Sequence, residues 1–337
     1  MLQVVTTIFL IFGTIVGAGF ASGNEIVVYF SRFGDISYFY IFVASVLLFF
    51  LFFFFLHYGK HIVKKIENSK ILNFIVTIIS IVFSASMYAG IDGLLSYFPK
   101  IWKVVMMTCV LALCLLVTMK GIGGLEKFNL FLMPILGVLF FVVLLFCTGL
   151  QSSTQITNSQ SFFGILFCPL YVALNTSMNL FVMSKQGEKL SKKQAVFASL
   201  FSAILLFVFL VLCNFVLLQN PESYAREMPV LFLVKDEKIV FVLEFFVILI
   251  GCFSTLISLC FTLKNSLKKL IKNNYLTIFS SVFLPYILCG VGFSRIILFF
   301  YPICSVFGIF ILLFSIFSFK QTDEIIHAKS KHTQNRC

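Results

Sequence analysis

The sequence has very little charge for its length. Of its 337 residues, 11% are Asp, Glu, Lys or Arg, and the chain holds one Trp and four His. Soluble domains carry about 25% charged residues, so this chain lacks the polar side chains needed to cover a surface that faces water. The shortage excludes an ordinary soluble protein and indicates that the solvent of most of the chain is a lipid bilayer.

Negative charge is especially scarce. Asp and Glu number 13 against 25 Lys and Arg, which gives a formal net charge of +12. Such an excess can indicate a nucleic-acid partner, but here the Lys and Arg lie in short loops between apolar runs, where they set membrane orientation. We therefore expect the bilayer, and no nucleic acid, as a partner.

Clustered metal-binding and catalytic residues are also missing. The ten Cys form no CxxC pair and no Cys/His cluster, which argues against zinc or redox chemistry. No apolar run brings His together with Ser, Asp or Glu at helical spacing, and His57 and His61 stand among lysines at the edge of a run. The sequence thus predicts neither an enzyme nor a bound cofactor.

Long apolar runs, in contrast, fill the chain. Hydrophobic residues make up 60% and Phe alone numbers 46. The strands of a transmembrane barrel would alternate apolar and polar residues, and residues 46–56 do not. We therefore predict an all-α polytopic membrane protein with ten transmembrane helices, at about 3–31, 36–57, 71–98, 102–119, 128–150, 161–183, 194–218, 239–263, 276–293 and 295–319.

The distribution of positive charge supports ten spans. Of the 25 Lys and Arg, 18 fall in one alternating set of loops together with the C-terminal tail. A wrong number of spans would scramble this alternation, so the positive-inside rule predicts a multi-pass plasma-membrane protein with both termini in the cytoplasm. Residues 1–319 would form one transmembrane domain, and residues 320–337 a basic, disordered cytoplasmic tail.

Ten spans divide into two halves, about 3–150 and 161–319. The first span of each half is unusual: one is rich in glycine, and the other contains Pro169 and a polar run at 175–179. Interrupted segments at corresponding positions are the sequence sign of a transporter built from inverted repeats. We therefore predict a 5+5 inverted repeat in which helices 1 and 6 are broken.

The opening stretch GTIVGAGFASGNE, residues 13–25, concentrates four glycines. Each glycine destabilises a helix by about 1 kcal/mol relative to alanine, so the stretch favours an unwound segment near 17–21. Carbonyls near 13–16 would then suit a cation, and N–H groups near 22–24 an anion. Close helix packing through the GxxxG pair of Gly13 and Gly17 is the alternative.

Glu25 follows directly, and a carboxylate at membrane depth is a functional hypothesis by default. Three roles are open. It could take part in proton coupling, hold the ammonium group of a solute, or pair with Arg32 near the outer surface. Asp92 and Glu244 stand nearer the ends of their spans, and we expect both at the membrane interface.

The eighth span reads GCFSTLISLCFTLKNS and carries small and hydroxyl residues on one helical face, Gly251, Ser254, Thr255 and Ser258. Hydroxyl and carbonyl oxygens are hard ligands suited to a small cation. The other interpretation is that the hydroxyls bond back to the preceding helical turn.

Both motifs resemble those of YkvI-type membrane proteins, a group within the amino acid–polyamine–organocation superfamily with the LeuT fold. The G-x-x-x-G-x-G pattern of that fold's first helix is matched by Gly13, Gly17 and Gly19. The small residue and hydroxyl pair of its eighth helix are matched by Gly251 and by Ser254-Thr255. The resemblance covers the whole ten-helix layout, but its specific part is these two short motifs.

The resemblance implies a sodium site and a solute site. Sodium would be held by carbonyls and hydroxyls of the first and eighth spans, at Gly13, Val16, Gly251, Ser254 and Thr255. The solute would lie near mid-membrane against residues of spans 1, 3, 6 and 8, namely Gly17, Ala18, Gly19, Phe20, Ala21, Glu25, Tyr88, Tyr171, Asn175 and Ser258. Tyr88 is assigned by position only, and packing explains it equally well. The family's other sodium site needs an amide where this chain has Phe20, so we expect that site to be missing.

The leading functional hypothesis is a secondary active transporter of a small, amino-acid-like solute, driven by sodium, with proton coupling through Glu25 as the rival. A non-transporting small-molecule sensor with a transporter fold is the alternative, because spore germinant-receptor membrane subunits resemble the same layout. The sequence leaves the solute, the direction of transport and the oligomeric state open.

Overall fold

The computed structural model describes residues 1–150 and 162–334, and every regular element within them is helical. The first span consists of α1 (Leu2–Ile15), α2 (Ala18–Ala21) and α3 (Asn24–Tyr29). Nine further apolar segments of this part of the chain are long enough to cross a membrane. Their main helices are α4 (Ser37–Asn68), α5 (Lys70–Leu94), α6 (Lys100–Lys120), α7 (Ile122–Cys147), α8 (Phe167–Gly187), α9 (Lys192–Gln219), α11 (Lys238–Leu267), α12 (Asn274–Leu288) and α14 (Tyr301–Gln334).

The predicted all-α membrane architecture is therefore confirmed. The predicted spans overlap these helices in order; residue 161, the expected start of the sixth, lies outside the described residues, as do 335–337 of the tail.

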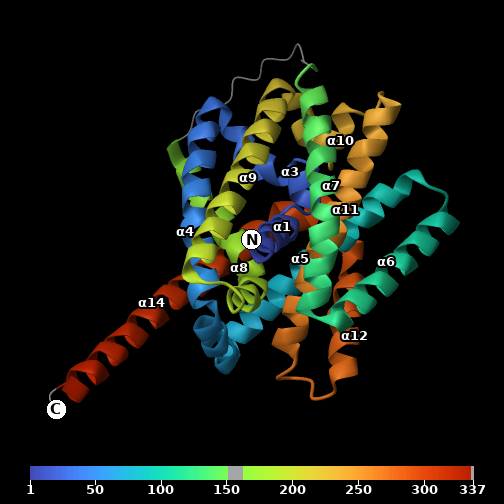
Figure 1. The fold of residues 1–337 in the computed structure, drawn as a ribbon. Helices are drawn as coiled ribbons and strands as arrows, with labels where there is room; N and C mark the ends of the chain where they lie inside the picture. Colours follow the sequence, from blue (N-terminus) through green and yellow to red (C-terminus); the bar gives the residue numbers. More distant parts are fainter. Residues whose placement is uncertain (151–161, 335–337) are drawn as a thin grey trace.

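Helix α1 lies in the middle of the bundle (Figure 1). It packs against α7, α8, α9 and α11, while α4 packs on α8 and α9, and α5 packs on α11. Side chains of α1 such as Leu10 and Phe12 are fully buried. The glycine-rich first span is thus surrounded by protein, which is the condition under which irregular backbone is tolerated at membrane depth.

The outward faces of the peripheral helices are apolar. On α6 and α7, for example, the exposed fraction of the side chain is 59% for Val104, 71% for Phe131 and 64% for Val138. Large apolar side chains that face outward in a chain with so little charge are solvated by lipid tails. The bilayer, as the solvent, thus explains the abundance of Phe noted in the sequence.

The connection between α9 and α11 forms two short helices, η4 (Pro221–Ala225) and α10 (Pro229–Leu233). A proline stands at the start of each. Proline suits the first helical turn, where its missing N–H would have no partner, but it cannot continue a preceding helix. The two prolines therefore divide the connection.

The sixth span is not broken, contrary to the prediction. Helix α8 is continuous, and Pro169 lies in its first turn, where proline is tolerated. The polar run is accommodated within the helix, because Asn175 and Asn179 each donate a side-chain hydrogen bond to the carbonyl four residues earlier, at 3.0 and 2.8 Å. The prediction of a break in the sixth span, which was based on Pro169 and the polar run, is therefore wrong.

The expected disordered tail is also helical as far as Gln334, because α14 continues past the bundle (Figure 1). Extending an existing helix fixes one residue for each new hydrogen bond, so it avoids the cost of nucleation. Lys, Glu, Gln and Ala in the tail are good helix formers.

Two helical glycines allow a test of the packing of α14 on α8. A Cβ at Gly308 would lie 2.8 Å from the Ala173 carbonyl oxygen, whereas a Cβ at Gly137 would meet only the Phe209 ring, at 4.0 Å. We expect Gly308→Ala to lower the thermal unfolding temperature of the protein in detergent. The same change at Gly137 should raise the unfolding temperature slightly, because alanine stabilises a helix relative to glycine by up to about 1 kcal/mol. Equal effects at the two positions would contradict the close approach of α14 and α8.

Candidate solute and ion site

The first span is interrupted twice. Helix α1 ends at Ile15, and Gly17 has extended backbone angles, φ −101° and ψ −162°. The chain then makes the single turn α2 and breaks again at Gly23, whose φ of 81° favours glycine. The predicted break is present, but residues 18–21 are a helical turn and not an unwound stretch. The residue types explain this, because Ala18, Phe20 and Ala21 are compatible with a helix.

The first break faces α11. The Thr255 hydroxyl donates to the Gly13 carbonyl oxygen at 3.1 Å. A Cβ at Gly251 would lie 2.7 Å from the Val16 carbonyl oxygen, so this glycine lets α11 approach the freed backbone closely. Four of the five predicted sodium ligands, Gly13, Val16, Gly251 and Thr255, are therefore adjacent. Because the Thr255 hydroxyl bonds to another helix, the alternative that it bonds back to the preceding turn of its own helix does not apply.

The fifth predicted ligand leads to a residue that sequence reasoning missed. The Ser254 hydroxyl donates to the Asn129 side-chain carbonyl on α7. Asn129 is fully buried, and its amide nitrogen has no hydrogen-bond partner among the described residues. An amide inside the apolar run FNLFLMPIL is the signal that could have revealed it. Three helices thus bring carbonyl, hydroxyl and amide oxygens to one buried place, which suits a small hard cation.

Glu25 lies at the second break and is buried, with 4% of its surface exposed. One carboxylate oxygen accepts a hydrogen bond from the Asn175 amide of α8 at 3.3 Å. The other turns back toward α2, where a Cβ at Gly19 would lie 2.9 Å from it. The structure therefore joins Glu25, Gly19 and Asn175, three of the predicted solute residues.

Arg32 does not neutralise Glu25. Its guanidinium lies over the rings of Phe33 and Phe167, at 5.0 and 4.4 Å from their centroids. No ion pair joins it to Glu25, although both residues are described. The sequence left this pairing open as a structural role for Glu25, and the geometry does not support it.

Tyr171 completes one wall of this region. Its ring packs edge-on against Phe30 and Tyr29, with centroids 4.9 and 5.5 Å apart. Its hydroxyl is buried and has no hydrogen-bond partner within the described chain, and neither has the side-chain oxygen of Asn175. Two buried polar atoms without partners beside a carboxylate are uncommon in a finished core, and a polar guest could satisfy them.

The other predicted solute residues are placed differently. Met87, not Tyr88, faces the first break: its sulfur accepts from the Ala18 N–H at 3.4 Å, while Tyr88 packs edge-on against Tyr286 at 5.5 Å. Ser258 bonds back to the Ser254 carbonyl at 3.1 Å. Phe20 packs edge-on against Phe140 on α7, at 6.3 Å between centroids.

The connection before and within α10 covers the second break, where α3 begins, toward one end of the bundle. The Val230 N–H donates to the Ser22 carbonyl at 2.9 Å, and the Asn24 amide donates to the Glu227 carbonyl at 2.9 Å. These bonds join both sides of the second break to the connection between α9 and α11. Access from this end requires them to separate.

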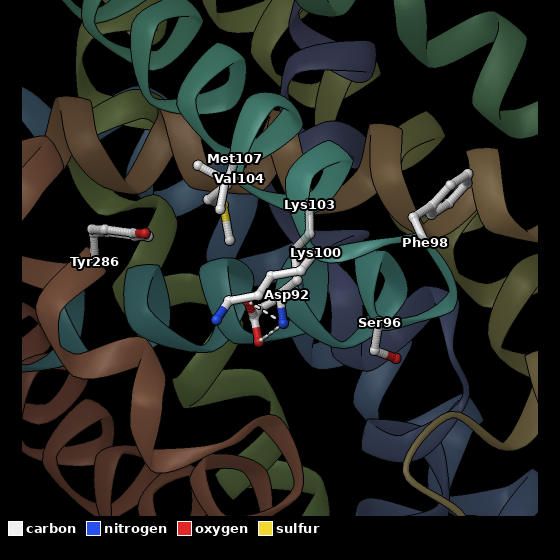
Figure 2. Close-up of a pocket in the computed structure, with 8 residues that line it drawn as sticks. All are labelled: Asp92, Ser96, Phe98, Lys100, Lys103, Val104, Met107 and Tyr286. Carbon is white, nitrogen blue, oxygen red and sulfur yellow. Dashed lines mark hydrogen bonds and ion pairs between the residues drawn. The ribbon is translucent and has the colours of Figure 1, made fainter.

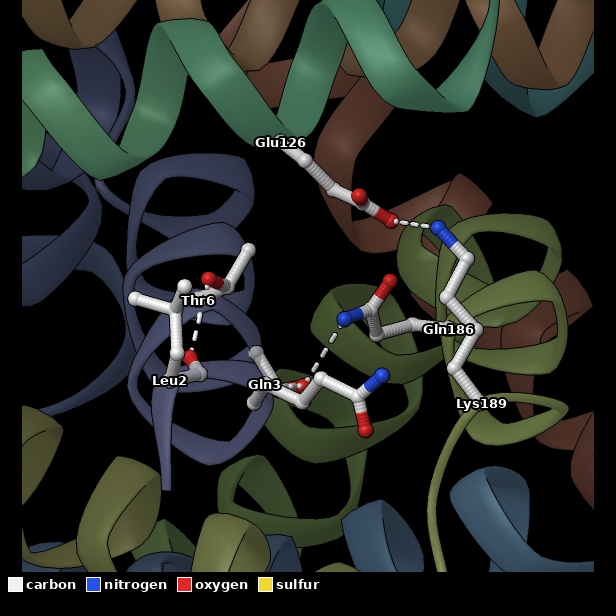
Figure 3. A network of polar contacts seen from close by, with 7 residues as sticks. Leu2, Gln3, Thr6, Glu126, Gln186 and Lys189 are labelled. Carbon is white, nitrogen blue, oxygen red and sulfur yellow. Dashed lines mark hydrogen bonds and ion pairs between the residues drawn. The ribbon is translucent and has the colours of Figure 1, made fainter.

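A polar network closes the opposite end (Figure 3). The Gln186 amide of α8 donates to the Thr7 hydroxyl of α1 at 3.0 Å, and Thr7 donates to the Gln3 carbonyl at 2.7 Å. Lys189, just after α8, pairs with Glu126 at the start of α7. The site between these two closures is buried from both ends of the bundle.

The two acids expected at the interface have different surroundings. Asp92 is half-exposed and pairs with Lys103 at 2.9 Å, as an interfacial residue should. Glu244 is fully buried, and neither of its carboxylate oxygens has a hydrogen-bond partner in the described structure. It lies only two turns into α11, but Cys147 of α7 and Cys213 of α9 lie near its carboxylate. Position along a helix therefore did not predict that protein encloses Glu244.

Glu244 provides a stability test. Replacing a buried polar group that has no partner by an apolar group of similar shape is neutral or stabilising. We expect Glu244→Met to raise the free energy of unfolding by about 1–3 kcal/mol, measured by thermal unfolding in detergent. The matched change Glu25→Met removes a hydrogen-bonded carboxylate and should give no gain. A lower melting temperature for Glu244→Met would contradict the isolation of this side chain.

Comparisons with known proteins agree with this geometry. No family model matches the chain. It is similar to the uncharacterized membrane protein YkvI of Bacillus subtilis (strain 168), with 22% identity over 312 residues, which cover 88% of this chain and 90% of that protein. The predicted resemblance to YkvI-type membrane proteins is therefore confirmed over almost the full length of both.

Among solved structures, the chain resembles Mhp1, a transporter of the nucleobase-cation-symport-1 family. That structure is in a closed conformation with bromovinylhydantoin bound. The TM-score is 0.55 at 15% identity, over 90% of this chain and 74% of Mhp1. This likeness shows the fold, and it confirms the predicted LeuT-like architecture.

Proposed function

We propose that this YkvI-type membrane protein is a secondary active transporter of a small solute that carries an amine, and that sodium drives it. The observation that carries the proposal is that the broken first helix contacts α8 and α11 inside the buried core of the bundle. Freed backbone carbonyls and hydroxyls lie at the first break and the Glu25 carboxylate at the second, between two closures.

Sodium coupling is supported by the chemistry of the first break. Its oxygen donors are carbonyls of α1, hydroxyls of α11 and the Asn129 amide of α7. None of these groups carries a charge, so a monovalent cation would not be held as tightly as by a carboxylate cage. A coupling ion must be released in every cycle.

An amine on the solute is supported by Glu25. The carboxylate is buried and turns toward α2, and among the described residues its partner is an amide and not a cation. A buried carboxylate is costly unless it is paired, and the ammonium of an amino-acid-like solute would pair with it. The hydroxyl of Tyr171 and the oxygen of Asn175 would accept further hydrogen bonds from that ammonium.

The contacts between helices support a division of the molecule into two groups of spans that would move against each other. Spans 1, 2, 6 and 7 would rock against spans 3, 4, 8 and 9, since α4, α8 and α9 pack together and α5 packs on α11. The two closures lie at opposite ends of the site, so alternate opening would give alternating access. The excess of lysine in the loops at the end where α1 begins supports a cytoplasmic position for both termini under this proposal.

Thr255→Ala tests the ion. We expect purified wild-type protein to be stabilised more by sodium than by potassium, because binding to the folded state raises its stability. Loss of the Thr255 hydroxyl should abolish the sodium-specific rise in melting temperature. The matched control is Thr262→Ala, whose hydroxyl bonds only to the Ser258 carbonyl of its own helix at 3.1 Å and should leave the response intact. Equal responses of the two variants to sodium would contradict the proposed sodium site.

Glu25→Gln tests the solute. Amino acids and related amines would be screened by thermal shift in sodium, and the stabilising compound would then be used for uptake into vesicles. We expect Glu25→Gln to weaken solute binding at least tenfold, or about 1.4 kcal/mol, while sodium still stabilises the protein. Uptake that follows a pH gradient, and not a sodium gradient, and that is lost in Glu25→Gln, would show proton coupling instead. Binding without uptake under either gradient would show a sensor.

A further inference from the structure

A hollow lies where α5 ends and α6 begins, and none of the residues proposed to bind the solute or sodium lines it. It has a volume of about 430 Å³ and is enclosed by α5, α6 and α12 (Figure 2). Charged groups line one side, Asp92, Lys100 and Lys103, and apolar groups of α6 line another, Val104 and Met107. The hollow is therefore amphipathic.

The charged side has a positive excess. Asp92 and Lys103 form an ion pair at 2.9 Å, which leaves the Lys100 ammonium uncompensated among the charges that line the hollow. Figure 2 shows both lysine side chains extending beside Asp92. The net charge of this group is +1, so it favours an anion, and the anion could contact both ammonium groups at once.

Neighbouring residues fix the depth of the hollow in the bilayer. Trp102 is the only tryptophan of the chain, and its side chain is 59% exposed, next to Lys103. Tyr97, before α6, is 65% exposed. Exposed Trp and Tyr beside lysines mark the level of the lipid headgroups. The charged side of the hollow is thus at headgroup level.

The apolar side continues down a helix that faces lipid. Ile101, Val104 and Val105 of α6 are 73%, 59% and 47% exposed. They lie in the first two turns of α6, which run from the headgroup level into the bilayer. A molecule whose anionic group lay on the lysines would have an apolar surface directly beneath it.

We propose that this hollow binds an anionic phospholipid, with its phosphate on Lys100 and Lys103 and its acyl chains along α6. Phosphate suits the two ammonium groups, and the chains suit the exposed apolar face. A free inorganic anion would use only the charged half, and an uncharged lipid only the apolar half. The inference does not depend on the solute or on the coupling ion.

Thermal-shift titration of the full-length protein in an uncharged detergent tests the proposal. The probes are dioctanoyl phosphatidylglycerol, dioctanoylglycerol and inorganic phosphate. We expect only the phospholipid to stabilise the protein strongly. Lys100→Gln keeps the Asp92–Lys103 pair and should weaken the apparent affinity about fivefold, as one Lys near an anionic headgroup contributes. Asp92→Asn raises the positive excess and should strengthen the affinity by a similar factor.

Lys120→Gln is the matched control, since it removes an exposed lysine from the opposite end of the same helix. Its titration should match the wild type. The proposal would be overturned by equal stabilisation from dioctanoylglycerol, which needs no charge. Stabilisation by inorganic phosphate at the same concentration would indicate a free-anion site. Weaker lipid binding by Asp92→Asn would remove the electrostatic basis altogether.

Discussion

The structure depends on the contact between the interrupted first span and α11. Backbone groups freed at membrane depth are tolerated only where protein, water or a guest can satisfy them. Here the Thr255 hydroxyl satisfies the Gly13 carbonyl, and Gly251 allows the Val16 carbonyl to lie against α11. Without a glycine at 251 and a hydroxyl at 255, the break would leave carbonyls exposed to an apolar core. The rest of the bundle encloses this one contact.

Burial from both ends gives the contact its functional meaning. The site lies between the hydrogen bonds of Ser22 and Asn24 to the α10 region and those of Gln186 to Thr7. Each closure consists of a few hydrogen bonds or ion pairs, each with a net contribution of about 1 kcal/mol. Such closures are weak enough to open one at a time, whereas the apolar core between the helices stays packed.

Sequence reasoning found the architecture because membrane constraints are strong. Length and hydropathy located the spans, and glycine content located the first break. It was wrong about the sixth span, because Pro169 in a first turn and amides bonded to their own helix do not interrupt it. It missed Asn129: the amide inside an apolar run is visible in the sequence, but its place beside α11 depends on how α7 packs. It misplaced Tyr88, since neighbouring residues on a helix point in different directions.

The continuity of α8 makes the two halves of the molecule unequal. A helix with all its backbone groups bonded internally can offer a guest only side chains, here Asn175 and Tyr171, whereas the first span also offers its main chain. Main-chain groups are the same whatever the sequence, but side chains change with a single codon. Diversification of what such proteins recognise is therefore expected to proceed through α8, while the glycines of the first span keep the common framework.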